Sequence, residues 1–290
     1  MRHQLWTAIV AELARLHNGR PGRGQRFSDR RILEVYFFAV VRKLPVRHAC
    51  DARNWPVWLR GRPLPSPAAM SRRMRSRSVR ELLAALDQAV VRPPAGRGDG
   101  GLAHWIDSTP LPIGPTSTDR HAAFGHAGGT KANGYRLHLF LRGDGSVADW
   151  RLTPMNRDER VMARRMIRSA KATGYLVGDG NFDVNALHGE CEVRGDLRLI
   201  APKRKGGFGR RKHRRGRYES AALLAEPRGP FAAALMTGRI AVERFFGTLK
   251  SAGTGLIGLP PWVRTMPRVR PFVITHLILD ALRRRGAVAA

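Results

Sequence analysis

The chain changes character at a Pro- and Gly-rich stretch, "RPPAGRGDGG", which covers residues 92–101. Pro and Gly interrupt both helices and strands, so this stretch is predicted to be a linker. Before it, apolar residues recur at helical spacing, and after it they alternate with polar residues or form short apolar blocks. The sequence therefore predicts a helical domain over 1–92, a linker over 93–101 and a second domain over 102–290.

The first region carries several signals for helix starts. Ser28 precedes "DRRILEVYFFAVV", and Ser66 precedes Pro67, which suits a first helical turn. Ser78 with Glu81 three residues later has the spacing of a capping box. The short helix after Ser66 has small residues and arginines, as does the second helix of a helix-turn-helix, so its arginines are candidate DNA contacts. An ordinary solvated basic helix is the alternative. The two arginines concerned are Arg72 and Arg73.

The second region reads as a mixed α/β domain. "GYRLHLFLR" alternates apolar and polar residues, as a half-buried strand does, and a "DGS" turn separates it from "VADWRLTP". A helix is expected over 157–174, ended by Gly174. Strands followed by a helix and then by further strands predict a mixed sheet with helices packed on it. The other expected strands are "LAHWIDSTPL", "YLVGDGNF" and "DLRLIAP".

Charge is the strongest signal about partners. The chain has 52 Lys and Arg against 22 Asp and Glu, a formal net charge of +30. Such a chain is attracted to a polyanion, and nucleic acid is the usual one. A genome rich in Arg codons would raise the count without clustering the charge, and an anionic membrane surface is the weaker alternative. No apolar run approaches the roughly 20 residues that span a bilayer.

Other features favour a reducing cytoplasm. The N-terminus lacks a long apolar core and a cleavage site, so no signal peptide is expected. Cys50 and Cys191 lie far apart and match no metal-binding spacing, and both are expected to be buried thiols.

One segment is dense in positive charge. Residues 203–217, "KRKGGFGRRKHRRGR", contain no acid and too few apolar side chains to form a core. We expect a loop that follows a phosphate backbone, although a solvated charge run is the plainer alternative. Its candidate DNA contacts are Lys203, Arg204, Lys205, Arg210, Arg211 and Lys212. Lys131, beside two glycines in "AGGTKANGYRLH", is a further candidate phosphate contact.

Three acids stand out against this charge. Asp107 and Asp179 each follow an apolar strand, and a strand end can hold a carboxylate rigidly. Glu243 lies in "RIAVERFFGTLK", where Val242, Phe245, Phe246 and Leu249 fall on one helical stripe expected to pack on the sheet. An Arg239–Glu243 pair four residues apart explains one acid locally, but it does not explain the other two. Asp183 is the alternative to Asp179, and we expect it to cap the following helix.

Carboxylates held together repel, and a divalent cation relieves the repulsion. Mg²⁺ takes oxygen ligands, and two such ions can clamp the attacking and leaving oxygens of a phosphodiester displacement. A basic chain with three gathered acids would therefore carry out phosphoryl transfer on DNA.

Three segments resemble the DDE transposases of bacterial insertion sequences: "WIDSTPLPIG", "YLVGDGNFD" and "RIAVERFFGTLK". The resemblance covers roughly residues 104–285, and "AGGTKANGYRLH" looks like the hairpin that follows the first Asp. It implies that Asp107, Asp179 and Glu243 are the catalytic, metal-binding triad. The subgroup signature Tyr-x-x-Arg-x-x-x-Glu-x-x-x-x-x-x-Lys fits at Arg239, Glu243 and Lys250, whereas Met236 stands at the Tyr position.

The resemblance also implies a fold, a cofactor and partners. The fold would be ribonuclease-H-like, and two Mg²⁺ ions, for which Mn²⁺ can substitute, would serve DNA cleavage and joining of the 3′-hydroxyl to target DNA. Arg239 and Lys250 would contact DNA. Double-stranded DNA, both element ends and target, would be the substrate of a homo-oligomer in the bacterial cytoplasm, associated with the nucleoid. A nuclease of the same fold and a non-catalytic, DNA-binding remnant of a mobile element are the alternatives.

Overall fold

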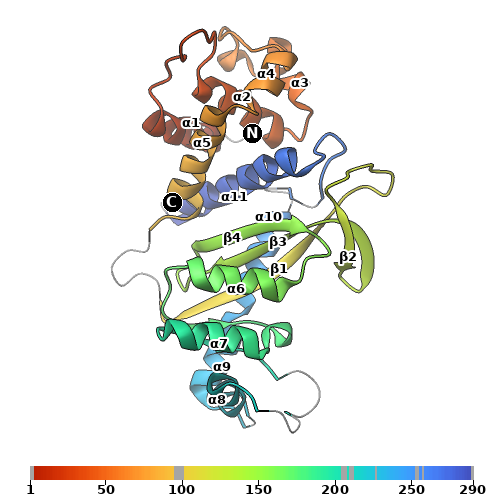
Figure 1. Cartoon of the computed structure of the whole chain (residues 1–290). Coiled ribbons are helices and arrows are strands. Elements are labelled where there is room, and N and C mark those ends of the chain that lie inside the picture. The colour runs from red at the N-terminus through yellow and green to blue at the C-terminus, as the bar shows by residue number, and fades with distance from the viewer. Residues whose placement is uncertain are drawn as a thin grey trace. The chain divides into compact units, whose positions relative to one another are not determined.

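The computed structural model describes residues 3–94, 101–203, 208, 212–225, 227–251, 255–256 and 258–288 (Figure 1). Contacts divide the chain into two compact units. The first unit comprises Met1–Val91, Thr116–Asp119 and Leu249–Ala290, and the second comprises Arg92–Pro115 and Arg120–Thr248. The division at 92 and the single domain over 102–290 stay predictions, while the C-terminal helix groups with the N-terminal helices. None of the described helices is long and apolar enough to cross a membrane.

The first unit is helical over its described residues. Helix α11 packs against η3 and α1, and α2 packs against α3 and α5. The elements are α1 (His3–Leu16), α2 (Asp29–Val41), α3 (Val46–Ala49), η1 (Ala52–Asn54), η2 (Val57–Leu59), α4 (Pro67–Arg73), α5 (Arg77–Leu86), η3 (Asp87–Val91) and α11 (Met266–Val288).

Serine caps fix the starts of three of these helices. Ser28 accepts a hydrogen bond from the Arg31 amide, and Ser66 caps α4 with Pro67 in its first turn, as predicted. The capping box at Ser78 is wrong. Ser76 caps α5 instead, and the Ser78 hydroxyl donates to Asp29 across to α2. The local pattern assigned the Ser78 side chain to a cap, but it binds a residue distant in sequence instead.

Before α4 the chain forms the 3₁₀ turns η1 and η2 rather than a helix joined by a short turn. The helix-turn-helix therefore stays a prediction. Arg72 is exposed on α4, whereas Arg73 forms an ion pair with Asp29 and donates to the Phe27 carbonyl at 2.9 Å. The Arg73 guanidinium thus joins α4 to the start of α2.

An aromatic cluster forms the centre of this unit. The rings of Phe38 and Trp55 stack with centroids 3.9 Å apart, and Trp6 meets Trp55 edge-on at 5.8 Å. The Trp55 indole N–H donates to the Ala49 carbonyl at 2.8 Å. Trp55 therefore combines apolar burial with a satisfied polar atom, which is how a buried indole is normally accommodated.

The second unit contains the sheet. Its strands are β1 (Ala103–Pro112), β2 (Ala123–Ala127), β3 (Thr130–Leu141), β4 (Val147–Pro154), β5 (Gly174–Val177) and β6 (Leu197–Ile200). Its helices are α6 (Glu159–Ser169), η4 (Gly180–Phe182), α7 (Asn185–Arg194), α8 (Arg215–Leu223), α9 (Pro230–Gly238) and α10 (Ile240–Lys250), whose last two residues belong to the first unit.

The sheet is mixed, with strand order β2-β3-β1-β5-β6 and with β4 paired to β3. Strand β3 runs antiparallel to β1, β2 and β4, whereas β1, β5 and β6 are parallel. Figure 1 shows α6 in front of this sheet. Ile106 and Phe140 point into a core with side chains of α6 and α7. Successive side chains alternate across a strand, so Trp105 and Asp107 face the opposite side. There the Trp105 ring lies against Gly238 at the end of α9.

Three expectations are wrong, and two of them concern this unit. The helix after β4 ends at Ser169, and Gly174 begins β5 with a φ of +97°. Strand β3 is buried on both faces rather than one over its last eight residues, and α6 packs on it. Cys191 is buried as expected, but Cys50 is only partly so, and both thiols are free.

The polar residues of β3 are accommodated by partners. Arg136 forms an ion pair with Glu159 of α6, and His138 hydrogen-bonds Thr153 of β4 at 3.0 Å. Paired polar side chains can be buried at much lower cost than unpaired ones. An alternating pattern therefore did not identify a solvent-facing side here.

The aromatic cluster yields a stability prediction. Trp55 is 2% exposed, so Trp55→Ala removes a large buried ring and should lower the free energy of unfolding by about 3–5 kcal/mol. Val57 is 77% exposed, and Val57→Ala should change it by no more than about 0.5 kcal/mol. Urea unfolding followed by circular dichroism measures both. Equal shifts in the two variants would contradict the importance of the cluster.

Candidate active site

Asp107 lies inside strand β1 and not at its end, which corrects the sequence expectation. The strand continues to Pro112, and Asp107 lies opposite Leu139 of β3. Pairing with β5 stops at Trp105, so beyond that point β1 has a neighbour on one side only. Proline is tolerated where its missing N–H would face an open edge, which explains why Pro110 and Pro112 do not end the strand.

Asp179 does follow its strand, as predicted. It comes two residues after Val177, the last residue of β5, and its carboxylate accepts a hydrogen bond from the Asn181 amide at 2.8 Å. Trp105 pairs with Val177 in the parallel ladder. Asp107 and Asp179 each stand two residues beyond that matched pair, so the sheet register brings the two acids to neighbouring positions.

Glu243 comes from the first turn of α10, and the predicted apolar stripe of this helix is buried. Val242, Phe245 and Phe246 are buried, whereas the Glu243 side chain is 57% exposed. Glu243 and Arg239 form the predicted ion pair at 3.2 Å. The buried stripe fixes the rotation of the helix about its axis, and this rotation leaves the carboxylate at the margin of the core.

Asp179 and Glu243 act electrostatically on Asp107. The pKa of Asp107 is raised to about 6, mainly by burial and also by the negative charges of Asp179 and Glu243. The Ser108 amide, which donates to Asp107 at 2.7 Å, and the positive charge of Arg239 act in the opposite direction. The negative charges of the other two acids therefore disfavour the ionised form of Asp107.

The geometry of the acids meets some requirements of a metal site and not others. The donor set consists of carboxylate oxygens, which suit a hard divalent cation, and the repulsion at Asp107 is the kind that a cation relieves. Yet in the part of the chain that the structure describes, no three His, Cys, Asp or Glu side chains gather closely enough to hold a metal ion. The Arg239 guanidinium pairs with Glu243, and the Asn181 amide with Asp179. The shared magnesium pair stays a prediction.

Asp183, the alternative acid, is committed elsewhere. Its carboxylate is buried, accepts two hydrogen bonds from Arg217 at 2.8 and 2.9 Å, and lies 3.3 Å from the His188 ring nitrogen. The expectation that it caps a helix is wrong, because Val184 occupies the cap position of α7. Asp183 holds α8 against α7, which leaves Asp179 as the acid beside Asp107.

The predicted DNA contacts are scattered over both units. Lys131 is exposed on strand β3, and Lys203 and Lys212 are exposed in the second unit. Lys203 lies 4.7 Å above the Phe208 ring. Lys250 ends α10 and belongs to the first unit. Arg204, Lys205, Arg210 and Arg211 lie outside the described residues.

Arg136 is a site neighbour that the sequence analysis did not identify. Its guanidinium forms an ion pair with Glu159, donates to the Ser108 hydroxyl at 3.3 Å, and interacts electrostatically with Asp107. The available signal was an arginine inside an alternating apolar strand. Such a residue must find partners if the strand is covered on both faces.

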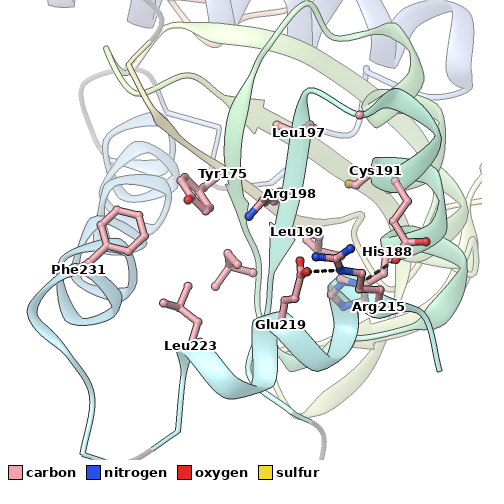
Figure 2. A pocket seen from close by; sticks show the side chains of 14 residues that line it. Tyr175, His188, Cys191, Leu197, Arg198, Leu199, Arg215, Glu219, Leu223 and Phe231 are labelled. Atoms are coloured by element: carbon pink, nitrogen blue, oxygen red, sulfur yellow. Dashed lines mark hydrogen bonds and ion pairs between the residues drawn. The ribbon is translucent and has the colours of Figure 1, made fainter. Parts of the chain in front are cut away.

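A cavity of about 620 Å³ lies away from the acids (Figure 2). Strand β6 and helices α7, α8 and α9 line it, with Tyr175 and Phe231 at one end and an Arg215–Glu219 ion pair near the other. Asp107, Asp179 and Glu243 do not line it. The acids are therefore not enclosed by this cavity.

The raised pKa of Asp107 gives a stability prediction. Its pKa is about 6 in the folded protein against an ordinary value of 3.8 for an aspartate. The unfolded chain thus loses this proton first, and Asp107 destabilises the fold as pH rises from about 4 to 6. Asp107→Asn should be more stable than the parent by about 2 kcal/mol at pH 7–8, with a difference that shrinks towards pH 4.

Thermal or urea unfolding across this pH range measures the effect. Asp144→Asn is the matched control, because Asp144 is exposed in the turn between β3 and β4 and amide replacement preserves its acceptor for the Ser146 amide. A pH-independent difference between Asp107→Asn and the parent would show that ionisation of Asp107 does not lower the free energy of unfolding.

Comparison with known families identifies the domain. Residues 100–257, just over half of the chain, match the family described as the transposase DDE domain. The matched range contains Asp107, Asp179 and Glu243 and all six strands. No match was found among curated proteins or among solved structures. Given the extent of the family match, the chain belongs to the transposases with a DDE domain.

Proposed function

We propose that this protein is a DNA transposase that cuts at the ends of an insertion sequence and joins the freed 3′-hydroxyl to target DNA. The observation that carries the proposal is the match of residues 100–257 to the transposase DDE domain, because this range contains Asp107, Asp179 and Glu243. Within the matched domain, the charges of Asp179, after β5, and of Glu243, in α10, both act on Asp107 of β1.

The fold supports this proposal. Strands β4, β3 and β1 form an antiparallel half, and β5 and β6 extend it in parallel with β1. Helices α6 and α7 cover one face. We assign this arrangement to the ribonuclease-H-like class, in which acids on the central strands and on a later helix form the catalytic centre.

Asp107, Asp179 and Glu243 would hold the divalent ions, two Mg²⁺ or, in their place, Mn²⁺. When bound, two such ions activate the attacking oxygen and stabilise the leaving oxygen of an in-line displacement. The chain itself would position the phosphodiester. Arg239 already pairs with Glu243 and is 30% exposed, so it can also reach a phosphate oxygen. Lys250 would bind DNA at the end of α10.

The positive charge of the chain indicates which partners it binds. A formal net charge of +30 favours double-stranded DNA, both the element ends and the target. Arg72, Lys203 and Lys212 are exposed cations available for phosphate contacts. Because transposition joins two element ends in one event, a homo-oligomer assembled on DNA is part of the proposal. The setting would be the cytoplasm of a bacterium, at the nucleoid.

Loss of an acid should abolish chemistry but not binding. With Mg²⁺ and DNA carrying the inverted repeats that flank the gene, Asp179→Asn and Glu243→Gln should each lower the cleavage rate at least about a hundredfold. Gel analysis of labelled strands measures cleavage and joining, and fluorescence anisotropy measures affinity. Glu219→Gln is the matched control, since Glu219 is exposed on α8 and pairs only locally with Arg215.

The products separate the alternatives. Joined strands support the transposase, whereas cleavage without joining would identify a nuclease of the same fold. A wild-type protein that binds DNA and never cuts it would be a remnant. Cutting at the parental rate by either acid variant would refute the assignment of these residues.

A further inference from the structure

The hairpin formed by β2 and the start of β3 has two different faces. Ala127 pairs with Thr130, and Gly128 and Gly129 between them have φ angles of +59° and +88°. A two-residue loop with both φ angles positive is a type I′ turn, which suits the twist of a hairpin and favours glycine at both positions.

The inner face is packed closely against the rest of the unit. A Cβ on Gly125 would lie 2.5 Å from the Met155 carbonyl oxygen, and one on Gly134 would lie 2.3 Å from the Leu111 carbonyl oxygen. Only glycine fits at such distances, so this face has no room for a ligand. Strand alternation then directs Phe124 and His126 outward.

The outer face combines an aromatic ring with positive charge. Phe124 is 70% exposed, and its cross-strand neighbour is Asn133. His126 lies opposite Lys131, and both are exposed. Directly opposed residues of an antiparallel pair share one face, so these four side chains form one surface, which we name the hairpin face. Residues 120–135 contain no acid.

Arg136 fastens this hairpin to the strand that carries Asp107. Its guanidinium donates to the backbone carbonyl of His126 and to the Ser108 hydroxyl, and it forms an ion pair with Glu159. Ser108 is the residue after Asp107. The hairpin face is therefore held in a fixed position relative to strand β1, as a rigid binding platform requires.

We propose that the hairpin face binds the unpaired end of a DNA strand, with a base stacked on Phe124 and the adjoining phosphate at Lys131. An aromatic ring stacks on any base whose face is free, and a neighbouring cation tracks the backbone. Bases inside a duplex are already stacked, so an unpaired strand end is the form of DNA that this single ring fits. The inference rests on the proposed function, because cleavage at element ends creates strand ends, and the terminal bases of a cut strand can unpair.

A second copy of the chain is the competing occupant, because β2 lies at the edge of the sheet. Phe124 is the single large apolar side chain on the hairpin face, beside an imidazole and an ammonium group. Stable protein interfaces bury about 1,200–2,000 Å² around an apolar centre. The charge and the small apolar area favour DNA.

The test compares two single strands of equal length, one with normal bases and one built of abasic units. Binding is measured by fluorescence anisotropy in EDTA, so that no chemistry takes place. Phe124→Ala should reduce the preference for the base-bearing strand about tenfold, the effect of one stacked base. Phe124→Tyr should keep the preference, and Phe124→Leu should lose it.

Two further variants complete the design. Lys131→Ala should weaken binding to both strands alike and lower the slope of log affinity against log salt by about 0.7, the value for one phosphate contact on single strands. Val193→Ala removes an 85% exposed apolar residue from α7 and should change neither quantity.

An unchanged base preference in Phe124→Ala would overturn the proposal. So would a loss of DNA-free dimers in that variant, seen by sedimentation, with the base preference intact, because the face would then join two copies. Since the assay needs no cleavage, its result is independent of the proposed function. A protein that cuts DNA but fails this test retains its function without this contact.

Discussion

The site depends on the parallel pairing of β1 with β5. Trp105 and Val177 are partners in this ladder, and each strand reaches its acid two residues later. The acids are 72 residues apart in sequence (179 − 107) but neighbours in the sheet. The third acid, Glu243, comes from helix α10. The buried apolar stripe of α10 fixes the rotation of the helix about its axis. Trp105 contributes here too, because its ring lies against Gly238 just before α10 begins.

In this arrangement the negative charge of Asp107 lowers the stability of the fold. Asp107 is partly buried and repelled by Asp179 and Glu243, so its ionisation costs more free energy in the folded protein than in the unfolded chain. A fold selected for stability alone would place an amide or an apolar residue there. Destabilising charge is common where a site must bind an oppositely charged ligand. The nearby Arg239 relieves the strain only in part, since it pairs directly with Glu243.

Much of the fold could be predicted from local pattern, and the errors have a common origin. Strand β4 and the buried stripe of α10 followed from periodicity, which records short-range packing. The position of Asp107 within β1 could not be predicted, because tolerance of Pro110 depends on where β5 stops pairing. Ser78 and Asp183 had the local spacing of caps, but Asp29 and Arg217, distant in sequence, bind them instead. Long-range partners decided each of these cases.

Arg136 shows why rigidity between the hairpin and the acids depends on one buried side chain. Backbone pairing alone would let a two-stranded extension twist about its base, since such ribbons are marginally stable in isolation. The guanidinium bonds to β1 through Ser108, to β2 through the His126 carbonyl and to α6 through Glu159. Burying a guanidinium is costly unless such partners are present. Here the partners belong to β1, β2 and α6. One side chain thus fixes three elements around the strand of Asp107.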